Sequence, residues 1–115
     1  MHLKLNLKIK NMKREITKMK TLQVNNEMNK IPEADVELLK IMAHPVRLQI
    51  VKELEHRKIC NVTQLTELLN IPQSTVSQHL SKMRGKILRA ERKGLEMYYH
   101  VANAKACQIV GVLGL

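Results

Sequence analysis

The chain has 115 residues, of which 44% are hydrophobic, and a formal net charge of +10 at pH 7. This length allows one domain with a hydrophobic core, and the charge favours a polyanionic partner, with nucleic acid ahead of an anionic membrane surface. The sequence has no Phe or Trp and only two Tyr, Tyr98 and Tyr99, so it lacks the aromatic platforms on which proteins stack unpaired bases. We therefore expect double-stranded DNA as the nucleic-acid partner.

Residues 1–30 form a basic leader, in which eight Lys or Arg accompany only two Glu. We expect this leader to be disordered or to precede the true start of translation, because Met28 lies just before the first well-patterned helix. The other interpretation is a basic arm along DNA phosphates, or an amphipathic element that joins a dimer. Lys4, Lys8 and Lys10 interrupt its apolar residues, so we predict neither a signal peptide nor a membrane span. The chain has only two cysteines, without paired spacing, so we expect a cytoplasmic protein with no membrane partner.

Residues 31–115 are predicted to form one folded domain that opens with two helices. The first helix has the apolar stripe Val36, Leu39 and Met42. A break follows, and Pro45 suits the first turn of the second helix, where its missing N–H is no loss. On the second helix we expect Leu48, Val51 and Leu54 to point inward, and Arg47, Lys52 and Glu53 to point outward.

A second pair of helices is predicted next, joined by a short turn at residues 70–72. Asn61 is expected to cap the first helix of this pair, with Gln64 three residues later as in a capping box. The second helix of the pair begins near Gln73. Its buried face is predicted to carry Val76, Leu80 and Met83, which repeat at helical spacing.

Two strands are predicted after these helices, at residues 87–92 and 95–101, with a turn at Lys93 and Gly94. Asn103 then caps a final short helix. Two helices joined by a tight turn and followed by a basic hairpin predict a winged helix-turn-helix. This is a mainly α fold with a β-hairpin wing (α+β), whose second helix enters the major groove of DNA.

The exposed face of that predicted recognition helix is polar but almost uncharged, and basic residues surround it. Short hydroxyl side chains can approach base edges, and a Gln amide can make a bidentate contact with adenine. The predicted base-reading residues are Gln73, Ser74, Thr75, Ser77, Gln78 and His79. The predicted phosphate contacts are Ser81, Lys82, Arg84, Arg89, Arg92 and Lys93. Two alternatives stay open: His79 as a half-packed histidine beside the buried stripe, and Arg92 and Lys93 as charges that only aid solubility.

Three blocks of sequence carry a family resemblance. They are LLKIMAHPVRLQIVKEL, NVTQLTELLNIPQSTVSQHLSKMRG and ERKGLEMYYHV, and in this order they resemble the dimer helix, recognition segment and wing of the ArsR/SmtB family of repressors. The resemblance implies a homodimer assembled through the first and last helices of the domain. It also implies a two-fold-related operator that is read by the helix from Gln73 to Arg84.

The sensor sites of the ArsR/SmtB family are not recognisable in this sequence. Many members bind a metal through a Cys-x-Cys pair at the start of the third helix, where this chain has Asn61 and Thr63, with Cys60 one residue early. A second family site uses Asp, His and Glu on the last helix, which here offers only Cys107 among plausible ligands. We therefore expect no metal and no other cofactor.

Two alternative functions stay open, and a third class of function is not expected. Other relatives switch through a cysteine pair, so a redox-sensing repressor that uses Cys60 and Cys107 is one alternative, although both thiols fit small apolar positions. A regulator that keeps the fold but acts through a protein partner is another. An enzyme is not expected, because Asp35 is the only aspartate and no Gly-rich phosphate loop is present.

Overall fold

The computed structural model describes residues 6–14 and 30–115. The chain divides into two compact units, Met1–Pro32 and Glu33–Leu115. Within the first unit, residues 6–14 form a helix whose residues are all exposed, including the apolar side chains Leu7, Ile9 and Met12. The rest of the basic leader, residues 1–5 and 15–29, lies outside the described residues, so the expectation of disorder there stays a prediction.

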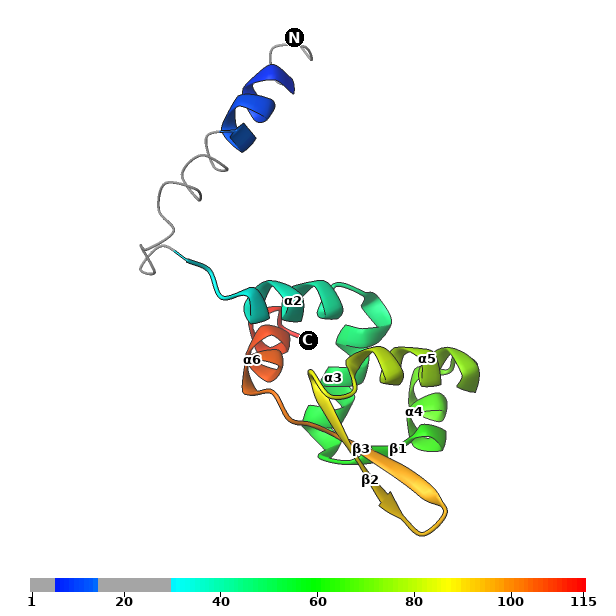
Figure 1. The fold of residues 1–115 in the computed structure, drawn as a ribbon. Coiled ribbons are helices and arrows are strands. Elements are labelled where there is room, and N and C mark those ends of the chain that lie inside the picture. The colour runs from blue at the N-terminus through cyan, green and yellow to red at the C-terminus, as the bar shows by residue number, and fades with distance from the viewer. Residues whose placement is uncertain (1–5, 15–29) are drawn as a thin grey trace. The chain divides into compact units, whose positions relative to one another are not determined.

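The second unit contains the predicted winged helix-turn-helix (Figure 1). Its elements are α2 (Glu33–Met42), α3 (Pro45–Arg57), β1 (Cys60–Asn61), α4 (Val62–Leu69), α5 (Gln73–Met83), β2 (Leu88–Lys93), β3 (Glu96–Val101) and α6 (Ala104–Val112). In Figure 1 the β2–β3 hairpin projects from the helices, and α2 and α6 are neighbours away from the tip of the hairpin. The predicted fold class is confirmed.

The break between α2 and α3 forms as the sequence predicts. Pro45 occupies the first turn of α3, where no intrahelical hydrogen bond is lost. His44 precedes it as the N-cap, and its Nδ1 accepts a hydrogen bond from the Val46 N–H at 3.1 Å. Helix α3 ends at Arg57, and Lys58 is its C-cap, with a φ of 76° and an N–H that donates to the Leu54 carbonyl at 2.8 Å.

The predicted apolar stripe of α2 is partly wrong. Met42 is buried as expected, but its core partner is Leu38, which lies four residues earlier on the same side of the helix. Val36 and Leu39 are 40% and 55% exposed in the single chain. The spacing of apolar residues cannot show whether these two side chains pack into the core or form a second, exposed apolar surface.

The predicted faces of α3 also need correction. Val51 and Leu54 are buried, but the third buried residue is Ile50, and Leu48 is only half-buried. Arg47 does not point freely outward, because it is half-buried and its Nη1 donates to the Ile41 carbonyl at 3.0 Å. The carbonyls in the last turn of a helix lack intrahelical partners, and Arg47 satisfies one of them.

The capping box at the start of α4 is confirmed. The Gln64 N–H donates to Asn61 Oδ1 at 2.8 Å, and the Asn61 N–H donates to Gln64 Oε1 at 2.9 Å. At the other end, Asn70 adopts the left-handed conformation with a φ of 52° and ends the helix. This cap sets the tight turn into α5, whose buried face is Val76, Leu80 and Met83 as predicted.

The wing is a three-stranded sheet with the order β1-β3-β2. Strands β2 and β3 pair antiparallel, and the last pair is Lys93 with Glu96. The turn is therefore Gly94 and Leu95, one residue later than predicted, because the positive φ of Gly94, 66°, suits the first position of a two-residue hairpin turn. Strand β1 was not predicted, since two residues are too few for a periodic signal.

Helix α3 lies at the centre of the hydrophobic core. It contributes Ile50, Val51 and Leu54, and the buried side chains of Ile87 and Leu88 anchor the base of the wing in the same cluster. Helix α6 adds Ala106 and Val110. Within residues 6–14 and 30–115, no helix has both the length and the apolar character needed to cross a membrane.

Candidate nucleic-acid interface

Helix α5 presents an exposed polar face on the side opposite its core residues. Most of the predicted base-reading residues lie exposed on this helix, and Thr75 is half-buried. The exposed members are Gln73, Ser74, Ser77 and Gln78. The structure therefore brings these side chains together on one helix, as the helical spacing predicts.

The predicted phosphate-contacting residues are exposed on α5, just after it, and on the wing. They comprise Ser81, Lys82 and Arg84 at the C-terminal end of α5, and Arg89, Arg92 and Lys93 on β2. In the described part of the chain, the basic residues of this set form no ion pair. Their charges therefore remain available to a polyanion.

The cations of the hairpin are divided between its two faces. Alternation along β2 places Arg89 and Lys93 on one face with Glu91, and Arg92 on the other. Lys93 Nζ lies 5.5 Å from the centre of the Tyr98 ring, a cation–π distance that holds the lysine near the wing tip. A phosphate backbone that contacts one face of the hairpin would not contact all three cations equally.

Lys86 belongs to the same basic stretch of sequence but is partnered within the protein. Its Nζ lies 3.4 Å from Glu37 Oε1 on α2, and both side chains are largely exposed. An exposed pair of this kind contributes little stability. The contact directs the charge of Lys86 toward α2, so we do not add this residue to the phosphate-contacting set.

His79 differs from the other residues of the recognition helix because it packs against α3. Its ring centre lies 4.4 Å from that of His44, and its Nδ1 accepts a hydrogen bond from Arg47 Nε at 3.1 Å. Burial lowers the pKa of His79, and the nearby His44 and Arg47 lower it further. The ring is therefore neutral at pH 7. The contact of Arg47 with α5 was not predicted, because the two residues are 32 positions apart and no sequence pattern near Arg47 indicates it.

The two thiols lie in different environments and both are protonated at neutral pH. Cys60 is buried in β1 and Cys107 is half-buried on α6. Burial raises the pKa of the Cys60 thiol and also that of Cys107, and a neutral thiol is a poor nucleophile. Among the described residues, no group of three or more His, Cys, Asp or Glu side chains is arranged to hold a metal ion.

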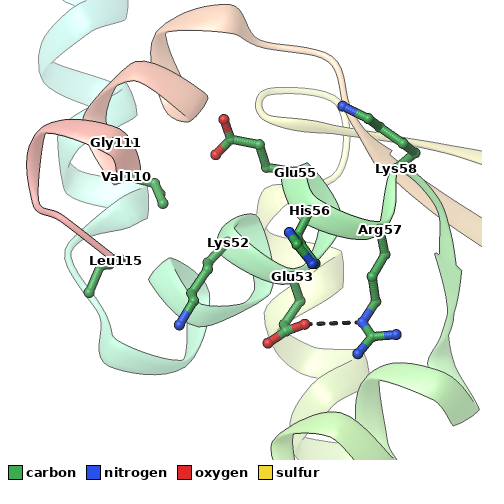
Figure 2. A pocket seen from close by; sticks show the side chains of 9 residues that line it. All are labelled: Lys52, Glu53, Glu55, His56, Arg57, Lys58, Val110, Gly111 and Leu115. Atoms are coloured by element: carbon green, nitrogen blue, oxygen red, sulfur yellow. Dashed lines mark hydrogen bonds and ion pairs between the residues drawn. The ribbon is translucent and has the colours of Figure 1, made fainter.

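Several surface depressions lie away from α5, and two of them concern the argument below. The larger, about 690 Å³, is drawn in Figure 2 and is lined mainly by charged side chains from the C-terminal half of α3. It contains the ion pair between Arg57 Nε and Glu53 Oε2 at 3.2 Å. A second depression, about 420 Å³, lies between α2 and α6 and is mostly apolar, with Leu39, Ile109 and Val112 in its lining.

A helix pair, a neutral recognition face and a basic hairpin define a DNA-binding protein of the winged helix-turn-helix class. The family model described as "Bacterial regulatory protein, arsR family" matches residues 44–86. The chain is 58% identical over 81 residues to the transcriptional repressor PagR of Bacillus anthracis. The aligned residues cover 70% of this chain and 82% of PagR. The chain therefore belongs to the ArsR family, as its three sequence blocks predict.

Solved structures and other relatives agree with this assignment. The crystal structure of PagR from Bacillus anthracis is 58% identical and superposes with a TM-score of 0.68 over 70% of this chain and 93% of the chain in that crystal structure. NolR from Sinorhizobium fredii is 32% identical, with a TM-score of 0.63 over 70% of this chain and 81% of NolR. The biofilm growth-associated repressor of Xylella fastidiosa is 34% identical over 88 residues, or 76% of each chain.

These findings confirm the predicted kind of activity. The protein is a DNA-binding transcriptional regulator of the ArsR family and not an enzyme, because its close relatives are transcriptional repressors.

Proposed function

We propose that the protein is a homodimeric repressor that binds a two-fold-related operator in double-stranded DNA. The observation that carries this proposal is the exposed face of α5, which is polar and uncharged and has exposed cations beside it on the helix end and on the wing. A neutral surface can approach base edges, while the surrounding cations attract and orient the phosphates.

In this proposal α5 enters the major groove and reads base edges. Gln73 and Gln78 offer amides that can pair with adenine, and the hydroxyls of Ser74, Thr75 and Ser77 are short enough to let the helix lie close to the bases. His79 contributes one ring donor at the edge of this face. Ser81, Lys82, Arg84, Arg89, Arg92 and Lys93 contact phosphates and fix the register of the helix in the groove.

The proposed dimer forms through α2 and α6. Val36 and Leu39 on α2 are exposed, and so are Val112 and Leu113 at the end of α6. Leu39, Val112 and Leu113 line the apolar depression between the two helices, and a two-fold axis would bury the same surface on both subunits. The salt bridge from Lys105 Nζ to Asp35 Oδ1, at 2.7 Å, joins α6 to α2 at the edge of this surface.

We further propose that the repressor acts in the cytoplasm and needs neither a metal nor another cofactor. In the described residues the ligand clusters that a metal site requires are absent. At the position where a metal-binding relative would place cysteine, Asn61 already uses its side chain for the cap of α4 and for a hydrogen bond to Glu96 at 2.7 Å.

Selection from a random duplex library tests the proposal. Full-length protein should enrich a two-fold-related sequence, and fluorescence anisotropy should then give an affinity at least about a thousandfold higher for that sequence than for a scrambled duplex. The logarithm of affinity should also fall linearly with the logarithm of salt concentration. Weak binding that is equal for both duplexes would favour a regulator that acts only through a protein partner.

A further inference from the structure

Arg47 connects three helices at the place where the recognition helix meets the rest of the domain. It lies in the first turn of α3, donates from Nη1 to the Ile41 carbonyl of α2 at 3.0 Å, and donates from Nε to His79 Nδ1 of α5 at 3.1 Å. Both contacts are partly buried. A planar guanidinium with two donors in fixed directions can hold both acceptors at once.

The direction of the second hydrogen bond determines where the His79 proton lies. The Nε of an arginine is always a donor, so His79 Nδ1 must be unprotonated. In a neutral imidazole the other nitrogen, Nε2, then carries the proton. The ring is also held by His44, whose centre is 4.4 Å away with a tilt of 48° between the ring planes.

His44 itself is held in a fixed position, which makes the arrangement rigid. Its Nδ1 accepts from the Val46 N–H at 3.1 Å as the N-cap of α3. The two histidines and Arg47 therefore form a cluster in which each side chain has a partner on the backbone or on another member of the cluster. Movement of α5 relative to α3 would break the Arg47 to His79 hydrogen bond.

We propose that Arg47 is a positioning residue for DNA recognition: it fixes the position of α5 through His79 and holds the His79 ring in the Nε2–H form, so that this ring presents a donor to the DNA. The inference rests on the proposed function, because it assigns a role to the helix that reads the operator. Arg47 does not need to contact DNA for this role.

Arg47→Lys is the variant that tests this role, and Arg57→Lys is its matched control. Lysine keeps the charge but loses the planar pair of donors. Arg57 lies on the same helix and its Nε also donates to a side chain, Glu53, at 3.2 Å, but it lies at the opposite end of α3. Both variants keep the net charge, so the affinity for random DNA and the salt dependence should not change.

The expected result is a loss of specificity in one variant only. Arg47→Lys should lower the affinity for the selected operator about tenfold, which is the effect of about one hydrogen bond, while Arg57→Lys stays within about twofold of wild type. An unchanged operator affinity in Arg47→Lys, or an equal loss in both variants, would overturn the proposal. Circular dichroism confirms that each variant is folded.

A second measurement gives a result for the wild-type protein that does not depend on how a variant folds. Nitrogen-15 NMR of the histidine rings distinguishes the two neutral forms, and His79 should show the proton on Nε2. In Arg47→Lys the two forms should both be populated. A wild-type His79 with the proton on Nδ1 would overturn the proposal even if operator binding is specific, whereas a failure of the proposed function would show as wild-type binding without sequence preference.

Discussion

At the scale of single residues, the interface separates side chains that can carry sequence information from those that can carry only charge. Gln78 is exposed on α5, whereas its near neighbour Leu80 is buried, and Lys93 is exposed at the end of β2. An amide can distinguish adenine from other bases, whereas an ammonium group attracts every phosphate alike. Substitutions of Gln78 and Lys93 should therefore have different effects on DNA binding.

Gln78→Ala should reduce discrimination between operator and random DNA, at a cost of about 1 to 3 kcal/mol on the operator alone. Lys93→Ala should weaken binding to both duplexes by similar factors. It should also reduce the slope of log affinity against log salt by about 0.9, the value for one phosphate contact. Anisotropy titrations of both variants on both duplexes measure these effects. If Gln78→Ala kept the full preference, α5 would not be the reading helix in the assigned orientation.

At the scale of elements, the cap of α4 links local sequence to the wing. The Asn61 side chain accepts from the Gln64 N–H at 2.8 Å, and its Nδ2 donates to Glu96 Oε2 on β3 at 2.7 Å. Asn61 also pairs with Tyr98 across the sheet. One side chain therefore starts the helix-turn-helix and fixes the first residue of the strand that returns from the wing tip.

Asn61→Ala should lower the free energy of unfolding by about 1 to 2 kcal/mol, because the variant has neither the helix cap nor the hydrogen bond to a carboxylate. Urea unfolding at equilibrium measures this change. Thr63→Ala is the control, since Thr63 is exposed on the same helix and its substitution should cost less than about 0.5 kcal/mol. Equal stability of the two variants would show that the cap contributes nothing measurable.

At the scale of the whole molecule, the exposed apolar residues of α2 and α6 support the proposed dimer. Val112 is 88% exposed and Leu39 is 55% exposed, and both line the depression between the two helices. A surface of this kind is costly to leave in water unless a second copy covers it.

Val112→Asp should therefore shift the protein from dimer to monomer, because a carboxylate would be buried at the proposed two-fold interface. Analytical ultracentrifugation measures the change, and operator affinity should fall with it because each monomer reads only one half-site. Leu95→Asp is a suitable control for the sedimentation measurement, since Leu95 is 97% exposed at the wing turn, away from α2 and α6. A wild-type protein that sediments as a monomer would contradict the proposed interface.

The basic leader makes a separate prediction at the same scale. A protein that begins at Met28 should keep its preference for the operator, because α5, the proposed reading helix, lies in the Glu33–Leu115 unit. If the leader neutralises phosphates, the truncation should reduce the slope of log affinity against log salt by about 0.9 for each of those phosphates. An unchanged slope would support the interpretation that the leader takes no part in DNA binding.

Features that depend on near neighbours in the chain could be predicted from the amino-acid sequence alone. The capping box at Asn61 involves a residue three positions away, the core face of α5 follows from 3.6 residues per turn, and the position of Pro45 follows from its missing N–H. These patterns were sufficient for the order of the helices and the two hairpin strands, and for the placement of Gln78 on an exposed face.

Contacts between residues that are distant in the chain could be recognised only in the folded molecule. Arg47 and His79 are 32 residues apart, and β1 exists only because β3 returns beside it. On α2, the spacing of apolar residues predicted that Leu39 lies on the apolar stripe of the helix, but only the fold shows that its side chain is exposed. Helical periodicity determines the direction of a side chain, but the three-dimensional arrangement of the other elements determines what that side chain contacts.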